Sequence, residues 1–383
     1  MPRLLLVTPG ELTRDPRARR AAVAALAAGY EVSGLCGVRA GEEPVPLVGV
    51  DITRVRHGRL PAGIGAAARV RGKELRGLFR IGRLAALTLG LVRAGRRLAA
   101  DVVHVHDFDA LPAGRLLARR RGARLVYDAH ELYADQEPGA PRIHRAIVRR
   151  LERKLARRAD AVVTVSEPIA QELERSLRLP ARPLVVLNCP PVTDVEPAPR
   201  GGGALRAVYQ GAAGPGRPLE DLLSAAEAAE GVHLTVRVVN ADLAALRATV
   251  AERGLAARVE IADPVGPDRL VEALAGFHAG LVINRPLTRN DELVLPNKLF
   301  EYLMAGLAAV VPRLPGLALI VESEGVGLTF EPGRPQELGA ALSALAREPE
   351  RLAELRARAR QVAVERYNAE AQAAALAAAW ATP

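Results

Sequence analysis

Two charged side chains, Lys298 and Glu301, interrupt the otherwise apolar stretch VLPNKLFEYLMAGLAAVVP at residues 294–312. Pro296 suits the first turn of a helix and Gly306 suits its C-terminal end, so a short helix is predicted here. Lys298 and Glu301 share one face of that helix and can form a surface ion pair worth a few tenths of a kcal/mol. The bulky apolar neighbours favour a ligand site instead, in which an ammonium binds phosphate and a carboxylate accepts from ribose hydroxyls.

A glycine-rich segment, YQGAAGPGRPLEDLL at residues 209–223, is a second candidate. A strand is predicted to run into the glycines, and Pro218 opens a helix whose first N–H groups, with Arg217 beside them, form an anion site. The spacing of Gly211 and Gly216 imitates a phosphate-binding loop, but Arg217 and Pro218 replace the Lys and Ser/Thr of that motif. Without that hydroxyl as Mg²⁺ ligand we exclude an NTPase; the alternative is that the glycines only form a tight turn.

Polar side chains also follow the apolar strand at residues 101–106. Asp107 and Asp109 have the spacing of the DxD motif that holds a divalent ion in some glycosyl-transfer enzymes. We favour the alternative that His104 is half-buried in the strand and that Asp109 caps the next helix. Ser166 is predicted to cap a helix and not to be a nucleophile. No metal site is therefore predicted.

Composition limits the function classes. The 383 residues are 49% hydrophobic with a mean hydropathy of +0.08, which excludes a disordered chain and favours two domains. A net charge of +10 points to anionic partners, but 3% aromatic residues argue against stacking platforms for single-stranded nucleic acid. The apolar run in MPRLLLVTPG is too short for a signal peptide or membrane span, and the two cysteines suggest neither a disulfide framework nor a metal site. We expect a cytoplasmic protein.

The arginine-rich stretch at residues 69–97 mixes basic and apolar residues at helical spacing. Such a helix can lie on a membrane surface, here the inner membrane face. Alternatively, its apolar stripe packs on the first sheet and its arginines face water, and we favour this packing.

Short β-branched runs alternate with alanine-rich helical stretches along the chain, which predicts parallel sheets covered on both faces. In the first half, strands are predicted at 3–7, 30–35, 101–106, 124–128, 160–166 and 184–187, and helices at 16–28, 65–98, 109–121, 142–158 and 167–178. After a Pro- and Gly-rich segment, strands are predicted at 206–211, 233–239, 258–261, 280–284, 308–312 and 327–330, and the chain is nearly all helical from Pro335.

This order predicts an α/β fold of two doubly wound, Rossmann-like domains. We expect the domains at residues 1–190 and 204–365, a linker at 191–203, and a C-terminal helix at 366–383 that packs back on the first domain. Ligands of such sheets bind at the carboxyl ends of the strands, so two facing domains imply a ligand cleft between them.

Five segments together resemble successive motifs of the retaining glycosyltransferases of family 4, whose GT-B fold has two Rossmann-like domains facing across a cleft. They cover nearly the whole chain in the family's order: DVVHVHDFDALPAG (101–114), LVYDAHELY (125–133), GRPLEDLLSA (216–225), LPNKLFEYLMAGLAAVVP (295–312) and RYNAEAQAAAL (366–376). PNKLFEY is the most specific of these motifs.

The resemblance implies that the second domain binds a nucleotide-sugar donor and the first domain an acceptor. Glu301 is expected to hold the ribose, Arg217 the pyrophosphate, and Lys298 a second phosphate or the sugar. The full set of donor-binding residues that it implies is Gly211, Arg217, Glu292, Pro296, Asn297, Lys298, Leu299 and Glu301. The acceptor-binding set is Gly10, Asp15, Arg17, His130 and Glu131. Catalytic roles fall to His130, Arg217 and Lys298, with no metal and no other cofactor.

Three positions depart from the family's pattern. Many relatives carry two glutamates separated by seven residues, but Leu293 stands where the first is expected, and Glu292 leaves eight residues before Glu301. The usual Gly-Arg after the first strand of the donor domain is Gly211-Ala212 here. Asn240 stands where glycine is commoner.

The resemblance implies transfer to an acceptor hydroxyl with retention, through a front-face reaction in which the departing phosphate helps to deprotonate the acceptor. The acceptor is left open among a glycan, a lipid-linked compound and a secondary metabolite. Two other functions are alternatives: a nucleotide-sugar epimerase of the same fold, and a basic, non-catalytic protein that binds nucleic acid or membrane. We favour the transferase, with no nucleic-acid partner.

Overall fold

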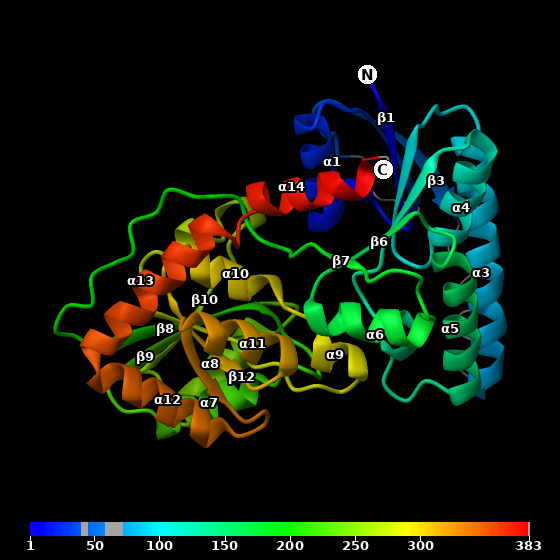
Figure 1. Ribbon diagram of the computed structural model, residues 1–383. Coiled ribbons are helices and arrows are strands. Elements are labelled where there is room, and N and C mark those ends of the chain that lie inside the picture. The colour runs from blue at the N-terminus through cyan, green and yellow to red at the C-terminus, as the bar shows by residue number, and fades with distance from the viewer. Residues whose placement is uncertain (40–44, 58–71, 382–383) are drawn as a thin grey trace. The chain divides into compact units, whose positions relative to one another are not determined.

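The computed structural model of the chain describes residues 1–39, 45–57 and 72–381. Internal contacts divide the chain into two compact units, which we call unit 1 (Met1–Val186 with Ala373–Pro383) and unit 2 (Leu187–Gln372). Each unit is built on one parallel sheet with helices connecting its strands, as the labels in Figure 1 show. The predicted α/β architecture of two Rossmann-like parallel-sheet domains is confirmed.

The seven strands of unit 1 lie in the order β3-β2-β1-β4-β5-β6-β7 and are all parallel. Its strands are β1 (Arg3–Thr8), β2 (Glu31–Arg39), β3 (Val50–His57), β4 (Val102–His106), β5 (Arg124–Asp128), β6 (Ala161–Thr164) and β7 (Leu184–Val185). Its helices are α1 (Pro16–Ala27), α3 (Gly72–Gly95), α4 (Leu111–Arg121), α5 (Arg142–Ala156) and α6 (Glu167–Leu177). Ser166 caps α6, as predicted.

The sequence prediction missed only β3 among the strands described in unit 1. Its sequence, VDITRVRH, places Asp51, Thr53 and Arg54 among the apolar residues, and this strand lies at the edge of the sheet. An edge strand exposes part of its surface, so it lacks the continuous apolar run by which the buried strands were found.

The six strands of unit 2 lie in the order β10-β9-β8-β11-β12-β13 and are also parallel. Its strands are β8 (Leu205–Ala212), β9 (Val232–Val239), β10 (Val259–Ala262), β11 (Ala279–Leu281), β12 (Ala308–Pro312) and β13 (Gly327–Phe330). Its helices are α7 (Leu219–Ala228), α8 (Leu243–Glu252), α9 (Arg289–Leu293), α10 (Asn297–Met304), α11 (Pro315–Glu324), α12 (Pro335–Arg347) and α13 (Pro349–Glu365). All six strands were predicted.

Both sheets reverse their strand order beside the first strand of the unit. In unit 1 the reversal lies between β1 and β4, and in unit 2 between β8 and β11. Open parallel sheets bind ligands at the carboxyl ends of the strands at such a switch point. The residues that follow these four strands are therefore the places to examine for a site.

The last helix, α14 (Ala369–Trp380), contributes its residues from Ala373 onward to unit 1. Trp380 is buried there, and its indole N–H donates to Nδ1 of His104 at 3.1 Å. This contact ties the C-terminal helix to the centre of β4.

Most of the arginine-rich stretch forms α3, and its first residues, 69–71, lie outside the described part of the chain. Leu87, Leu91 and Val92 of α3 are buried in unit 1, where the helix packs against α4 and β3. This supports the packing alternative for the apolar stripe. Within the described ranges, no helix combines the length and apolar character needed to cross a membrane.

Candidate functional site

The helix that carries Lys298 and Glu301 is α10. It begins directly after Pro296 and ends before Gly306, whose φ of 67° is left-handed, as predicted for a glycine at this end. Leu299 and Leu303 are fully buried in the apolar core of unit 2. The core therefore fixes the helix, and Lys298 and Glu301 with it, against the carboxyl end of β8.

Lys298 is a buried cation. Only 9% of the residue's surface is exposed, and Nζ has no hydrogen-bond partner among the described residues. Nζ lies 4.1 Å from the ring centroid of Tyr209. Gly211 leaves room for it, because the Cβ of any other residue at this position would lie only 2.5 Å from Nζ. Burial, and then the nearby Arg217, lower the pKa of Lys298 to about 7 against the opposing attraction of Glu301.

The glycine-rich loop runs beside this lysine. Gly211 has a φ of 153°, and the loop then turns through Gly214–Arg217, closed by a 2.8 Å hydrogen bond from the Arg217 N–H to the Gly214 carbonyl. The loop is fixed to the segment after β11, because the Arg285 N–H donates to the Gly216 carbonyl at 2.8 Å. Arg217 is half-buried at the start of α7, where the helix adds unpaired N–H groups to its positive charge.

The other predicted donor-binding residues occupy different environments. The start of α10 carries two half-buried residues, Pro296 and Asn297, and Glu301 is half-buried in the middle of the helix. Leu299 belongs to the core. Glu292 lies on α9 and forms a 2.7 Å ion pair with Arg289, next to the buried Leu293.

Two polar side chains at the carboxyl ends of β8 and β11, in the sheet of unit 2, were not predicted. Gln210 at the end of β8 and Asn284 after β11 are 6% and 7% exposed. Both side-chain atoms of the Gln210 amide, and Oδ1 of Asn284, lack a hydrogen-bond partner in the described part of the chain. The only signal in the sequence is a polar residue closing each apolar strand, in RAVYQG and GLVIN.

Asn240 follows β9 in the same sheet. Its φ of 62° lies in the left-handed region that asparagine and glycine share.

In unit 1, a cavity of about 420 Å³ lies at the carboxyl ends of β1, β2 and β4. Two predicted acceptor-binding residues, Gly10 and Asp15, line it, together with Glu11, Asp107 and Asp109. Asp15 also caps α1, because its Oδ1 accepts from the N–H groups of Arg17 and Ala18. Asp109 lines the cavity and does not cap α4, whose N-cap is Ala110, so that prediction was wrong.

His130 is held by Asp107. Its Nε2 lies 2.9 Å from Oδ1 of Asp107, which also accepts the hydroxyl of Tyr133. Burial disfavours the charged imidazole, but the hydrogen bond and the negative charge of Asp107 overcome this and raise the pKa of His130 to about 9. The pair with Asp107 thus favours the charged form of His130 at neutral pH. Glu131 beside it is half-buried and has a partner within the protein.

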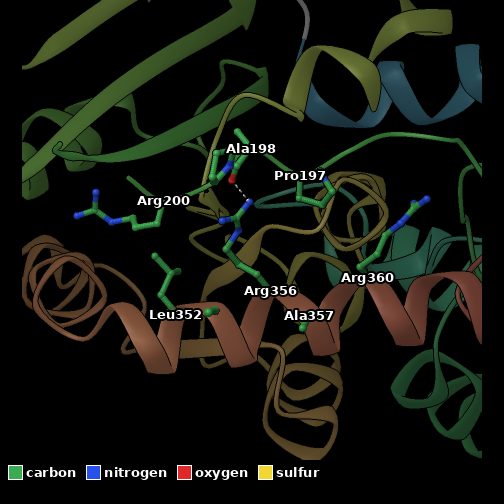
Figure 2. Close-up of a pocket in the computed structure, with 9 residues that line it drawn as sticks. Pro197, Ala198, Arg200, Leu352, Arg356, Ala357 and Arg360 are labelled. Carbon is green, nitrogen blue, oxygen red and sulfur yellow. Dashed lines mark hydrogen bonds between the residues drawn. The ribbon is translucent and has the colours of Figure 1, made fainter. Parts of the chain in front are cut away.

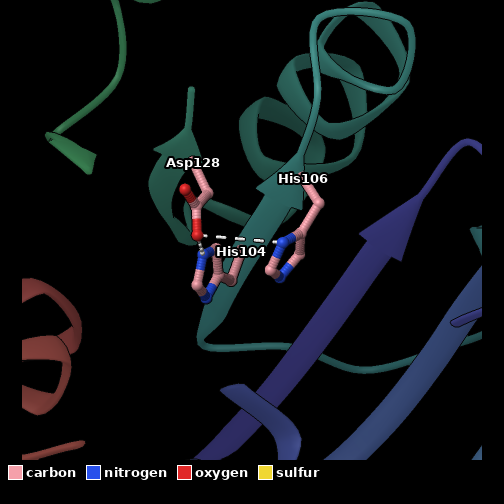
Figure 3. Close-up of side chains that lie close together, drawn as sticks. All are labelled: His104, His106 and Asp128. Carbon is pink, nitrogen blue, oxygen red and sulfur yellow. Dashed lines mark ion pairs between the residues drawn. The ribbon is translucent and has the colours of Figure 1, made fainter. Parts of the chain in front are cut away.

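Two buried imidazoles, those of His104 and His106, face one carboxylate oxygen of Asp128 (Figure 3). Nε2 of His104 and Nδ1 of His106 lie 3.6 and 3.7 Å from Oδ2 of Asp128, and Nε of Arg17 donates to the same atom at 2.7 Å. Arg17 holds the pKa of Asp128 well below its usual range, although burial opposes this. His104 is completely buried and not half-buried as predicted.

The same cluster offers three atoms of the kind that bind metals, but its charges favour a different partner. Arg17 already neutralises Asp128 through the oxygen that both imidazoles face, and a divalent ion there would lie beside a permanent guanidinium charge. Arg17 therefore fits the role of the cation in this cluster.

Unit 2 contains another cavity, of about 430 Å³, at the segment Pro197–Arg200 and α13 (Figure 2). Arg356 donates to the carbonyls of Gly306 and Ala198, and Arg360 donates to that of Thr193. These arginines fasten the connecting segment to the core, and none of the predicted site residues lines this cavity.

Comparison with known proteins identifies the two parts of the chain. Residues 17–194 match the model of Glycosyltransferase Family 4, and residues 217–378 match a model described as glycosyl transferase-like. No curated protein matches the chain.

Solved structures with the same fold cover almost the whole chain. A sucrose-phosphate synthase from Thermosynechococcus elongatus is 15% identical with a TM-score of 0.77, and 98% of each chain is covered. Anabaena Alr3699/HepE in complex with UDP is 15% identical with a TM-score of 0.72, again over 98% of each chain. The lipopolysaccharide outer core galactosyltransferase WaaB is 12% identical with a TM-score of 0.67 over 98% of each chain. The first part of the chain is thus similar to Glycosyltransferase Family 4 and the second to a glycosyl transferase-like family, and the chain has the GT-B fold.

Proposed function

We propose that this protein moves a sugar from a nucleoside-diphosphate-sugar to an acceptor hydroxyl, with retention at the anomeric carbon and without a metal ion. The observation that supports it most is Lys298, a buried ammonium without a hydrogen-bond partner among the described residues, beside Gly211 at the strand switch of unit 2. A diphosphate supplies the anion that such a group needs. HepE, which shares the fold, is described in complex with UDP and with UDP-glucose.

In this proposal Glu301 accepts hydrogen bonds from the ribose, and Arg217 and Lys298 bind the diphosphate. The bond between the anomeric carbon and the phosphate oxygen breaks while the acceptor oxygen bonds to the same carbon. Negative charge develops on the leaving diphosphate, where Arg217, Lys298 and the first N–H groups of α7 stabilise it. These fixed positive groups take the place that a divalent ion has in other transferases.

His130 acts in unit 1, where the cavity lined by Gly10 and Asp15 takes the acceptor. An imidazolium can donate a hydrogen bond but cannot accept a proton, so His130 positions a substrate and is not the general base. The proton of the acceptor hydroxyl therefore passes to the departing phosphate. This fits a front-face route to retention.

A thermal-shift panel of nucleosides, nucleoside diphosphates and their sugars tests the donor site. A ligand at a hundred times its dissociation constant adds about 2.7 kcal/mol of stability. Glu301→Ala should abolish the shift given by the best nucleotide. Arg217→Ala should weaken the diphosphate far more than the bare nucleoside; equal losses would refute the phosphate role of Arg217.

The reaction separates the proposal from its rivals. An epimerase would convert UDP-sugars to isomers with no acceptor present, and a basic binding protein would show steep salt dependence and no affinity for nucleotide-sugars. Once an acceptor is found, the anomeric configuration of the product, read by NMR in the presence of EDTA, tests retention and metal independence together.

A further inference from the structure

Gln210 is a polar residue of unit 2 whose burial the folding of the chain does not explain, because its side-chain amide is unpaired among the described residues. Along β8 the side chains alternate between two cores: Tyr209 packs in one, and Val208 packs in the other, together with Leu299 and Tyr302 of α10. Gln210 therefore points to the α10 face, like Val208. Its backbone N–H donates to the Tyr302 hydroxyl, but neither atom of its side-chain amide has a partner within the described residues.

Asn284 reaches the same face from the neighbouring strand. β11 pairs with β8 in the register Gly280↔Val208, and Val282 packs in the α10 core. The alternation continues past the end of β11, because Ile283 packs in the opposite core, and Asn284 therefore has the same orientation as Val282. The next residue is hydrogen-bonded to Gly216, so Asn284 adjoins the glycine-rich loop.

Leaving such groups unpaired costs about 1–3 kcal/mol each, and native proteins usually avoid it. Three side chains with such unpaired groups, Gln210, Asn284 and Lys298, lie at the switch point between β8 and β11. Parallel sheets bind ligands at such a point. Other buried side chains of unit 2, such as Asn368 and Ser343, are hydrogen-bonded within the protein. The gathering of unpaired groups at this edge points to a ligand that completes them.

The unpaired atoms indicate the chemistry of that ligand. Phosphate oxygens only accept hydrogen bonds, so they can satisfy Lys298 and the Gln210 N–H groups but not the two amide oxygens. A hydroxyl group both donates and accepts. The side chains of Gln210 and Asn284 therefore fit a part of the ligand that is rich in hydroxyls, beside the phosphate partner of Lys298.

We infer that Gln210 and Asn284 bind the hydroxyl groups of the sugar that is transferred, and so determine which donor sugar the protein accepts. This rests on the proposed function, in which the ribose hydroxyls are taken by Glu301. The two amides are then specificity residues of the donor site and not parts of its nucleotide clamp.

Calorimetric titration of the full chain with UDP, and with UDP-glucose, UDP-galactose and UDP-N-acetylglucosamine, tests the inference. The ratio of the UDP dissociation constant to that of the best nucleotide-sugar isolates the contribution of the sugar. Gln210→Met keeps the side-chain length without polar atoms, and Asn284→Ala removes the second amide. Gln361→Met, on the exposed face of α13, is the matched control.

Each site variant should lower that ratio about five- to tenfold while UDP affinity stays within about twofold. Gln361→Met should change neither value. Because Gln210→Met removes an unpaired buried amide, its ligand-free form should unfold at an equal or higher temperature than the wild type. A lower unfolding temperature with unchanged affinities would show a structural amide and overturn the inference.

Equal losses for UDP and its sugars would also overturn it, because the amides would then bind the nucleotide. If the wild type binds UDP and a UDP-sugar but both variants keep the wild-type ratio, the inference fails and the proposed function stands. If the wild type binds none of the nucleoside diphosphates and none of the nucleotide-sugars of the thermal-shift panel, the proposed function fails and the inference with it.

Discussion

In unit 1 the ionised side chains at the carboxyl ends of β4 and β5 are paired with one another, whereas the buried cation at the switch point of unit 2 has no hydrogen-bond partner among the described residues. The pairing in unit 1 is incomplete, because both ring nitrogens of the buried His106 also lack a hydrogen bond within the described part of the chain. In unit 1, Arg17 pairs with Asp128 at 2.7 Å and His130 with Asp107 at 2.9 Å. In unit 2, Lys298 has no hydrogen-bond partner among the described residues.

The two units have the same parallel sheet with the same reversal of strand order, so the difference does not come from the backbone plan. It comes from the side chains. Charges that are paired inside the protein stabilise it and orient a group such as His130. Groups left unpaired destabilise the free protein and gain their partners only from a ligand. The buried cation Lys298, which lacks a hydrogen-bond partner among the described residues, therefore marks unit 2 as the place for an anionic ligand.

The largest effect should come from breaking the internal pair of unit 1. Asp128→Asn leaves the guanidinium of Arg17 buried without its carboxylate, and we expect a loss of about 3–5 kcal/mol in the free energy of unfolding. Urea denaturation measures it. Asp101→Asn is the matched control, because the Arg3–Asp101 pair is exposed and should contribute little. A similar, small change in both variants would contradict the contrast between buried and exposed pairs.

The opposite change is expected in unit 2. Lys298→Met removes a buried cation and should raise the stability of the ligand-free protein by about 3 kcal/mol near pH 6. The pKa of Lys298 is about 7 in the fold and near 10.5 when unfolded, so the unfolded state binds more protons between these values and wild-type stability rises with pH there. The advantage of the variant should shrink from pH 7 to pH 10.

Unfolding curves at pH 6 and pH 9.5 measure this effect. Lys154→Met, which removes an exposed lysine of α5, should show no such dependence on pH. A Lys298→Met variant less stable than the wild type at pH 6 would mean that the ammonium has a structural partner.

A smaller effect concerns the charge of His130. Asp107→Asn removes the charge that raises the pKa of His130 to about 9, and this pKa should fall by roughly one to two units. The stabilisation that the Asp107 pair gives is complete below the unfolded pKa of His130 and is lost as the pH rises through about 9. An NMR titration of the imidazole resonances measures the shift, with the wild type titrated under the same conditions. An unchanged titration of His130 would show that Asp107 does not control its charge.

The sequence was a good guide to the fold because buried parallel strands are continuous apolar runs. RLLLV and AAVVP became β1 and β12, while the half-polar β3 escaped notice because an edge strand need not be apolar. The start of α10 after Pro296 and its end at Gly306 also followed from local chemistry.

The site was only partly predictable. Motif resemblance singled out Lys298 and Arg217, but that Lys298 is buried without a hydrogen bond depends on Gly211 and Tyr209, which only the fold brings to it. Gln210 and Asn284 escaped because an unpaired amide is a property of its surroundings and not of its residue type. Asp109 was misassigned for a similar reason: an aspartate before a helix resembles a cap whether or not it makes the hydrogen bond.

The most direct test of the donor site is the proton balance of nucleotide binding. Calorimetric titration of the full chain with UDP at pH 8, in two buffers with different ionisation enthalpies, counts the protons taken up on binding. Lys298 is mostly neutral in the free protein at this pH and should become protonated beside the diphosphate. We expect uptake of about one proton per UDP in the wild type and none in Lys298→Met. Binding without proton uptake in the wild type, or no binding of UDP or of any other nucleoside diphosphate, would contradict the account.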